Sequence, residues 1–505
     1  MVMPLKILNK LYIQILFAVT TALLLIMSTA GFGVSFTVFF AFIPLFFALS
    51  VEKNHPVLLG FITGFLYFSI CLSWMMITFG YFGGAPLIAA LALLIFISSL
   101  GALFFIVPFT YVFARISKNP CIISLLFILL EAVKGKVFFG GVPWLNLAQS
   151  QYKNTLILQS VSVFGEYGLS FLIMVINVLL FYLITDFKTK KNIILPFAVI
   201  LIMLLPGIYR AVNPIEYSEY KKIAVIQTGY NQEDKWDNDK WLNISNNINI
   251  QIMDAYNKNV DMIVLPESSY PVNILKTEFL INFLNKVSEK TPIIFGATRR
   301  IMVDNESKLF NTMVLLDNNT QTYYDKRHLT PFGEYFPFEN LLRPVKEFFF
   351  GKGSMFSPGD NAAILTSDNV KAAPVICFES AFSTLVSDSV ALGANLLVII
   401  SNDTWFGKNQ GRMQHLAVDT IRAVEYGRAV ARATQDGISA FILPNGEIPL
   451  MEDRQMPAVL IYDVPLSEYN TFFAKYSNIW IAFIIPLLYY RLRADRLKKK
   501  EKNGK

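Results

Sequence analysis

Cysteine and histidine are scarce in this 505-residue chain, which contains three of each. Cys71 and Cys121 fall in apolar stretches, so Cys377 stands alone in the polar second half and cannot form a disulfide within it. The histidines form no cluster with the spacing of a metal site. We therefore expect no metal ion and no other cofactor. A buried free thiol most often only packs as a small apolar side chain, so a chemical role for Cys377 needs further support.

Charged residues are also few, at 16% of the chain, whereas hydrophobic residues make up 54%. Soluble domains are rarely so apolar. The excess lies in residues 11–210, and residues 215–475 have the composition of a globular domain. A membrane-spanning helix needs about 20 apolar residues. We predict about eight spans, at 11–29, 34–51, 57–79, 86–114, 121–133, 168–185, 193–209 and 476–490.

These spans divide the chain into three parts. Residues 1–214 form a membrane domain of about seven spans, residues 215–470 a large polar domain, and residues 471–505 a last span with a basic tail. The span at 121–133 is short, and is either extended into the next loop or re-entrant.

Lysine and arginine are absent from the connections "GFGVS" and "GYFGGAP". They gather at the alternate connections, including Lys10, Lys53 and Arg115, and in the tail "RLRADRLKKKEKNGK". The positive-inside rule then places both termini in the cytoplasm and the polar domain on the other side of the membrane. The net charge of +7 follows from this distribution, and we expect no nucleic-acid binding because no basic face with interleaved aromatic residues is present.

Within residues 222–465, short apolar runs of strand type alternate with helical stretches at 236–258, 276–289 and 410–433. Continuous apolar runs followed by polar residues are typical of buried strands whose carboxyl ends present functional groups. The alternation predicts an α/β sandwich with its helices on the outside.

Three of the predicted strands end at different reactive side chains: Glu267 in "VLPESSYP", Lys326 in "YYDKRHLTPFGEYFP" and Cys377 in "PVICFES". Each alone would more often be a surface charge or a packed thiol. Together they suit acyl transfer through a thioester, because a carboxylate can take the thiol proton and a lysine can stabilise the thiolate and an oxyanion. No histidine is required, although His328 lies two residues after Lys326 and is an alternative base.

The segments "LPES", "DKRHLTPFGEYFP", "VICFES" and "SNDTWFG" resemble the carbon-nitrogen hydrolase (nitrilase) superfamily, whose members carry a Glu, Lys and Cys triad in an αββα sandwich. In the apolar half, "FGGVPWLNLAQSQ" and "FGEYGLSFLIMVIN" are similar to the apolipoprotein N-acyltransferase family, as is the stretch from 401 to 448. Nearly the whole chain takes part in the resemblance, and the combination is far more specific than "LPES" alone.

This resemblance implies a bacterial inner-membrane enzyme with its catalytic domain in the periplasm. It would move an acyl chain from a phospholipid to the α-amino group of the N-terminal S-diacylglyceryl cysteine of apolipoproteins, and we expect it to act as a monomer. In a ping-pong scheme, Glu267 is the general base and then the acid, and Cys377 carries the acyl group as a thioester. Lys326 and the backbone N–H of Phe378 would form the oxyanion site.

The resemblance also implies roles for further residues. Glu334 would position Lys326 or the amine, Glu379 would orient the loop after the nucleophile, and Trp236 would lie near the substrate. The family often has tyrosine where this chain has Phe378, so no role can rest on that hydroxyl here, whereas a backbone or packing role is unaffected.

We expect apolar segments to admit the phospholipid to the site. The segment "VKEFFFGKGSMFSPG" places Phe348, Phe349 and Phe350 in a row, and an exposed run of this kind meets a membrane or a ligand. We interpret it as a mobile lid, with a buried core segment as the alternative. Trp144 either lines a lipid entrance or anchors the chain at the membrane interface. Trp405, in "SNDTWFG", is a further candidate for substrate binding.

Two other functions stay open. A membrane-tethered amidase of the nitrilase type would carry the same triad but pass the acyl group to water, and the matching membrane half argues against it. A channel or transporter would be expected to show charged residues in mid-membrane, where Glu131 is the main candidate and lies near the end of a span.

Overall fold

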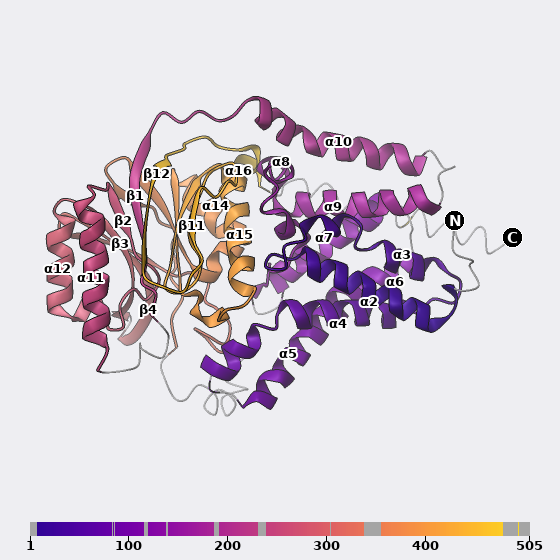
Figure 1. Ribbon diagram of the computed structural model, residues 1–505, viewed down its shortest axis with the longest axis horizontal. Helices are drawn as coiled ribbons and strands as arrows, with labels where there is room; N and C mark the ends of the chain where they lie inside the picture. Colours follow the sequence, from indigo (N-terminus) through magenta and orange to yellow (C-terminus); the bar gives the residue numbers. More distant parts are fainter. Residues whose placement is uncertain are drawn as a thin grey trace.

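The computed structural model describes residues 8–82, 84, 86–115, 120–137, 140–185, 191–230, 239–303, 305–337, 355–477 and 493. Trp236, Phe348–Phe350 and residues 478–490 of the predicted last span lie outside these described residues. The described chain forms a bundle of apolar helices, and beside it two facing sheets with flanking helices (Figure 1). We call these two parts the helical bundle and the sandwich.

The helical bundle packs around a core of leucine, isoleucine and phenylalanine side chains. Four of its helical stretches have the length and composition of membrane spans, namely Leu11–Ser28, Leu87–Arg115, Val161–Thr185 and Ile193–Val212. Two shorter apolar stretches are Ser35–Ser50 and Pro56–Cys71. The helices are α2 (Leu11–Ser28), α3 (Ile43–Ser50), α4 (Pro56–Cys71), α5 (Leu87–Gly101), α6 (Val107–Arg115), α7 (Pro120–Val137), α8 (Thr155–Leu158), α9 (Val161–Thr185) and α10 (Lys191–Val212).

The apolar stretch predicted as a span at 34–51 is not one continuous α-helix. It consists of a short 3₁₀-helix, η1 (Ser35–Phe39), followed by α3. Asn177 of α9 compensates for the break, because its side chain accepts from the Phe42 N–H at 2.9 Å and donates to the Val38 carbonyl at 2.7 Å. Backbone groups freed inside an apolar environment need such partners. Hydropathy reports the apolar composition of this stretch but not the break.

Helix α9 is kinked near its start. Gly165 has φ 69° and ψ −179°, a combination that is essentially restricted to glycine. A Cβ atom at this position would lie 2.2 Å from the ring of Phe473 in α16 (Phe472–Tyr476). The kink therefore lets the helical bundle and the end of the sandwich approach each other closely.

The sandwich contains two six-stranded sheets, with strand orders β12-β1-β2-β3-β4-β5 and β11-β10-β9-β8-β7-β6. The two sheets meet in one apolar core. The strands are β1 (Tyr220–Gln227), β2 (Met262–Val264), β3 (Ile293–Val303), β4 (Glu306–Asp317), β5 (Thr320–Asp325), β6 (Leu365–Ser367), β7 (Val370–Ile376), β8 (Leu396–Ser401), β9 (Ala429–Thr434), β10 (Ser439–Ile442), β11 (Leu450–Glu452) and β12 (Ala458–Pro465).

Helices cover both outer faces of the paired sheets. Helices α11 (Trp241–Asn257) and α12 (Glu278–Ser288) pack on the first sheet, and α14 (Ser383–Ala391) and α15 (Gly411–Tyr426) pack on the second (Figure 1). The predicted αββα sandwich is therefore confirmed. It forms because buried strands with apolar side chains on both faces need cover on both sides.

The helical stretch predicted at 410–433 is wrong in its last seven residues, 427–433. Helix α15 ends at Tyr426, and Gly427 with φ 62° forms its left-handed C-cap. The following residues form β9, in which Ala431 and Ala433 face the other sheet and Val430 faces the α15 side. Alanine favours helices, and the alanines at 429–433 therefore predict a helix there. These residues instead form a strand that pairs with β8.

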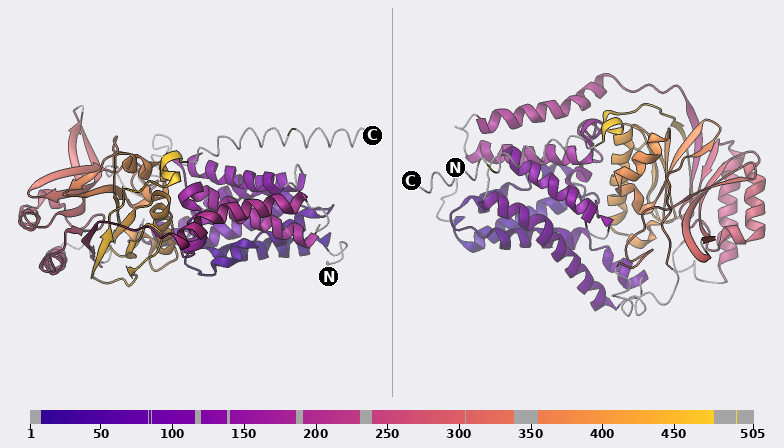
Figure 2. Two further views of the ribbon diagram at one scale, coloured as in Figure 1. Left: turned by 90° about the horizontal axis from the view of Figure 1, so that it is seen from above. Right: turned by 180° about the vertical axis from the view of Figure 1, so that it is seen from behind.

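Helix α15 is buried on two sides. Leu416 and Tyr426 pack in the cluster beneath the second sheet, whereas Val418 and Ile421 belong to the core of the helical bundle. Figure 2 shows the sandwich and the bundle side by side, with this orange helix at their junction. The residues that follow β7 and β8 are thereby held next to the apolar helices.

We expect Gly165→Ala to destabilise the protein by roughly 2–5 kcal/mol, because left-handed strain adds to overlap with Phe473. Gly33→Ala is the matched control: Gly33 also has positive φ, but a Cβ there meets no atom within 4 Å. Thermal denaturation of the detergent-solubilised proteins should give a clearly lower Tm for Gly165→Ala than for Gly33→Ala. Equal Tm values would contradict this account of the kink.

Candidate active site

The three side chains predicted for thioester chemistry converge between the two sheets. Glu267 follows β2 and Lys326 follows β5 in one sheet, and Cys377 follows β7 in the other. The Glu267 and Lys326 side chains are 8% and 1% exposed, and Lys326 Nζ lies 3.8 Å from Glu267 Oε1. The other Glu267 oxygen, Oε2, accepts a 2.8 Å hydrogen bond from the backbone N–H of Asn402, which follows β8. Glu267 thus links both sheets.

Glu334 joins this group as the direct ion-pair partner of Lys326. Its Oε2 lies 2.8 Å from Lys326 Nζ and also accepts from the Thr330 N–H at 2.7 Å. Burial alone would lower the pKa of Lys326, but the Glu334 and Glu267 carboxylates raise it above its ordinary value. Burial likewise opposes ionisation of Glu334, yet the Lys326 charge leaves its pKa below the ordinary value. Lys326 is accordingly a fixed buried cation.

Asn311 of β4 was not found by sequence reasoning. Its amide nitrogen donates to Glu267 Oε1 and to Glu334 Oε1, both at 2.7 Å. One amide group can donate two hydrogen bonds, and each acceptor here is a carboxylate oxygen. Asn311 therefore fixes the spacing of the two carboxylates around Lys326.

The turn before Glu267 depends on a glycine in the neighbouring strand. A Cβ at Gly296 of β3 would lie 2.7 Å from Glu267 Cα and 2.8 Å from the Ser268 nitrogen. The Gly296 N–H donates to the Pro266 carbonyl at 3.2 Å. The backbone carrying Glu267 can therefore sit directly against β3.

Cys377 occupies a strained position at the start of the 3₁₀-helix η8 (Cys377–Ala381), with φ 54°. Such a φ is uncommon for any residue other than glycine and is often found at functional turns. Burial raises the pKa of the thiol, the charge of Glu267 adds to that effect, and Lys326 opposes it. The resting group is a thiol that needs a base, and Glu267 is the neighbouring carboxylate.

We call residues 376–381, which carry Cys377, the nucleophile turn. Glu379 holds this turn to the loop that carries Lys326. Its Oε1 accepts from the Tyr324 hydroxyl at 2.9 Å and from the Arg327 N–H at 2.7 Å, and its Oε2 accepts from the Ile376 N–H at 2.9 Å. The His328 N–H also donates to Oε1, at 3.2 Å. Burial raises the pKa of Glu379, against the influence of Lys326.

The His328 ring packs on phenylalanine, and its Nε2 has no hydrogen-bond partner among the described residues. Its centroid lies 3.8 Å from that of Phe382 and 6.0 Å from that of Phe378. Burial, with the neighbouring Lys326 charge, lowers the pKa of His328 to about 4. The ring is therefore neutral at physiological pH.

Aromatic residues connect the nucleophile turn to the helical bundle. The Trp144 ring is buried, 6.2 Å from Phe378 and 6.1 Å from Phe406 between centroids. The indole N–H groups of Trp144 and Trp74 donate to the same Gln414 oxygen of α15, at 2.8 and 3.2 Å. Trp144 thus lies at the junction of bundle and sandwich.

Trp405 lies nearby in the 3₁₀-helix η9 (Asp403–Phe406) and is 37% exposed. Its backbone carbonyl accepts a 2.9 Å hydrogen bond from Thr78 of the helical bundle. Trp236 and Phe348–Phe350 lie outside the described residues. Among the described residues, no three His, Cys, Asp or Glu side chains are grouped as metal ligands.

Two facing sheets, with a glutamate, a lysine and a cysteine at their strand ends, form a sandwich whose residues 222–472 match the carbon-nitrogen hydrolase family. The sandwich therefore has a carbon-nitrogen hydrolase-like fold. Residues 21–179 match the apolipoprotein N-acyltransferase N-terminal domain. The chain belongs to the apolipoprotein N-acyltransferase family, and it is an acyltransferase.

Relatives with that name match along most of their length. The apolipoprotein N-acyltransferase of Shewanella oneidensis is 31% identical over 438 residues, covering 82% of each chain. That of Geobacter metallireducens is 30% identical over 483 residues, covering 92% of each chain. Among solved structures, a Nesterenkonia amidase from the nitrilase superfamily covers 51% of this chain and 95% of its own, at 17% identity and TM-score 0.38.

We expect Glu334→Gln to lower activity and to make it sensitive to high pH. Without this carboxylate the pKa of Lys326 falls, because burial still lowers it and Glu267 is left as the main group that raises it. The cation is then lost at a lower pH than in the unmodified protein. As pH rises, activity measured by acyl transfer should decline in the variant at a lower pH than in the unmodified protein. The ion pair between Arg327 and Asp388 supplies the control. Asp388→Asn removes an exposed carboxylate, and such a surface ion pair contributes little to stability. Identical pH profiles for all three proteins would contradict the assignment.

Proposed function

We propose that this chain transfers an acyl chain from a phospholipid to the α-amino group of the N-terminal S-diacylglyceryl cysteine of apolipoproteins. The observation that carries the proposal is the position of Cys377 at the junction with the helical bundle. The ring of the next residue, Phe378, lies 6.2 Å from that of Trp144 in the bundle. A thiol next to membrane helices is well placed to receive an acyl chain from the bilayer.

In the first half-reaction, Glu267 takes the thiol proton while the Cys377 sulfur attacks the ester carbonyl carbon of the phospholipid. The carbonyl oxygen becomes an oxyanion that Lys326 and the N–H of Phe378 stabilise. The bond to the glycerol oxygen then breaks. The lysophospholipid alkoxide takes the proton from Glu267, and the acyl group stays on Cys377 as a thioester.

In the second half-reaction, the α-amino group of the apolipoprotein attacks the thioester carbonyl carbon. Glu267 takes a proton from the amine, an amide bond forms, and the carbon–sulfur bond breaks. The proton then returns to the Cys377 thiolate. Both half-reactions pass through an oxyanion in the same place, so one lysine and one N–H serve both.

The remaining candidates have supporting roles in this scheme. Glu334 holds the Lys326 cation, and Glu379 holds the nucleophile turn against the loop of residues 324–328. Trp144 and Trp405 face the acyl donor at the junction. The same proposal gives Trp236 a substrate-binding role and Phe348–Phe350 the role of a lid.

We further propose about eight spans in a bacterial inner membrane, both termini in the cytoplasm and the sandwich in the periplasm. Contacts within the bundle support this orientation. Gln14 donates to the Lys53 carbonyl at 2.7 Å, and Arg115 lies 3.4 Å from the Asn54 carbonyl, so these basic connections share one end of the bundle. At the other end, Gln410 of the sandwich donates to the Ile70 carbonyl at 2.9 Å. The positive charges of Lys53 and Arg115 thus lie at the end of the bundle away from the sandwich, as the positive-inside rule requires.

The thioester is tested with a phospholipid labelled in its acyl chain. The purified protein should acquire label that hydroxylamine removes, and Cys377→Ala should acquire none. Cys71→Ala is the control, since Cys71 is a second thiol buried in the helical bundle. Mass spectrometry of an apolipoprotein N-terminus then distinguishes transfer from hydrolysis: an added acyl group is expected, and release of free fatty acid alone would indicate an amidase-like hydrolase instead.

The orientation is tested with one added cysteine at each of two exposed positions, and the labelling is compared with that of the unmodified protein. In spheroplasts, a membrane-impermeant maleimide should label Asn305→Cys, in the connection between β3 and β4. It should label Lys53→Cys only after the membrane is disrupted. The reverse pattern would refute the orientation.

A further inference from the structure

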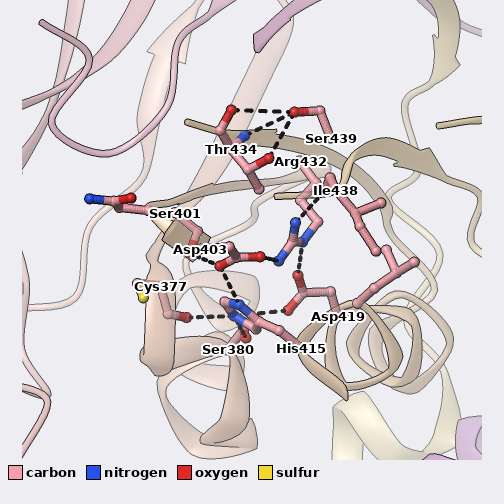
Figure 3. Close-up of polar contacts among 12 residues, drawn as sticks. Cys377, Ser380, Ser401, Asp403, His415, Asp419, Arg432, Thr434, Ile438 and Ser439 are labelled. Carbon is pink, nitrogen blue, oxygen red and sulfur yellow. Dashed lines mark hydrogen bonds and ion pairs between the residues drawn. The ribbon is translucent and has the colours of Figure 1, made fainter. Parts of the chain in front are cut away.

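A buried cluster of charged residues lies beside the turn that carries Cys377 (Figure 3). Asp403 of η9, His415 and Asp419 of α15, and Arg432 of β9 are each at most 1% exposed. Asp403 pairs with Arg432 at 2.8 Å, and Arg432 also pairs with Asp419 at 2.5 Å. The thioester scheme uses none of these four residues, although burying four ionisable groups is costly unless they are paired.

Both ring nitrogens of His415 face acceptors. Nδ1 lies 2.9 Å from Asp403 Oδ1, and Nε2 lies 3.3 Å from the backbone carbonyl oxygen of Cys377. Nε2 is also 3.2 Å from the Ser380 hydroxyl oxygen. A carboxylate and a carbonyl can only accept, so donation to both requires a proton on each ring nitrogen. The Ser380 hydroxyl could instead donate to a neutral Nε2, so the charges of the cluster decide between the two states. In the doubly protonated state the ring is an imidazolium that donates to Asp403 on one side and to the Cys377 carbonyl on the other.

The charges of the cluster favour the doubly protonated ring. Two carboxylates and one guanidinium would leave one buried negative charge, which the His415 cation cancels. Asp419 Oδ1 lies 3.9 Å from His415 Nε2 and contributes to this balance. Burial lowers the pKa of His415, as does Arg432, but Asp403 and Asp419 raise it above its ordinary value overall.

The carbonyl that His415 contacts belongs to the peptide group that also carries the Phe378 N–H. The described chain has no cis peptide bonds, so this carbonyl and N–H point in opposite directions. Figure 3 shows the Cys377 carbonyl oxygen pointing toward His415 and the Cys377 sulfur pointing away from it. The Phe378 N–H is therefore directed to the side of the reacting sulfur. A cation that donates to the carbonyl also polarises the N–H of the same peptide group.

We propose that His415, held by Asp403, is a positioning residue that orients and strengthens the Phe378 N–H as an oxyanion donor through the Cys377–Phe378 peptide group. The proposal rests on the thioester function of Cys377 proposed above. His415 does not touch the substrate and takes no proton from the thiol. Its effect is confined to steps in which a carbonyl oxygen becomes negatively charged.

This restriction separates His415 from a merely structural residue. Acylation of Cys377 by a phospholipid passes through an oxyanion, whereas alkylation of the same sulfur by iodoacetamide displaces iodide without forming one. A displaced nucleophile turn would slow both reactions, and a weakened oxyanion donor would slow only acylation.

The test compares these two rates in His415→Gln, with the full-length protein in detergent. We expect acylation from a labelled phospholipid to be about 10- to 100-fold slower. This is less than the roughly 10²–10³-fold cost of losing an oxyanion donor, because the Phe378 N–H itself stays in place. Alkylation of Cys377 should change by less than about threefold, as differences of that size correspond to less than 1 kcal/mol. His55→Gln is the matched control, because His55 is exposed at the start of α4 and far from the turn. Parallel loss of both rates, or unchanged acylation, would overturn the proposal.

A second measurement needs no variant at position 415 and so applies even if His415→Gln fails to fold. The chain has only three histidines, and histidine-selective ¹⁵N labelling therefore gives few ring signals. His55→Gln and His328→Gln assign two of them. We expect both His415 ring nitrogens to stay protonated from about pH 6 to about pH 8, where an ordinary histidine loses its charge. A neutral His415 ring at pH 7 would overturn the proposal.

Failure of the thioester function would have a different signature. In that case the unmodified protein itself would acquire no hydroxylamine-sensitive label. If the unmodified protein is labelled and His415→Gln keeps its ratio of acylation to alkylation, only the role of His415 is refuted.

Discussion

The buried ion group around Lys326 is the constraint on which the rest of the site depends. Lys326 and the carboxylates of Glu267 and Glu334 together carry one negative charge in an environment nearly closed to water. A thiolate formed without proton uptake nearby would add a second negative charge, which explains why the resting thiol of Cys377 is protonated. Transfer of its proton to Glu267 leaves the total charge unchanged. The site therefore avoids the cost of creating a new buried charge, and only the position of the charge changes during the reaction.

Buried charges are also paired at the junction with the membrane helices. Arg422 of α15 lies 2.5 Å from Glu166 of α9 and 3.1 Å from Glu425, and all three are buried. The Glu166 N–H donates to Glu425 at 2.7 Å. Removing one partner of a buried ion pair is usually far more costly than replacing the whole pair, so such groups fix the relative position of the elements that carry them. Helix α15 thus holds the sandwich on the bundle through ions as well as through apolar packing.

The sequence was sufficient to predict the sandwich and the convergence of Glu267, Lys326 and Cys377, because a strand that is apolar on both faces leaves its functional groups at its end. It could not reveal Asn311, whose two hydrogen bonds depend on the register between β3, β4 and β5. Nor could it assign His415, since its contact with the Cys377 carbonyl depends on the rotation of α15 against η8. Apolar composition could not indicate the interruption between η1 and α3 either. Asn177 of α9 stabilises that interruption by hydrogen bonds to its backbone groups.

Phe378 joins the chemistry of the turn to its packing. Its ring lies 5.2 Å from Phe382 and 6.2 Å from Trp144, in surroundings made of aromatic rings. Phe378 is half-buried, and these ring contacts help to seat the turn. Whatever Phe378 contributes to the reaction must then come from its backbone, which His415 approaches from the opposite side of the same peptide group.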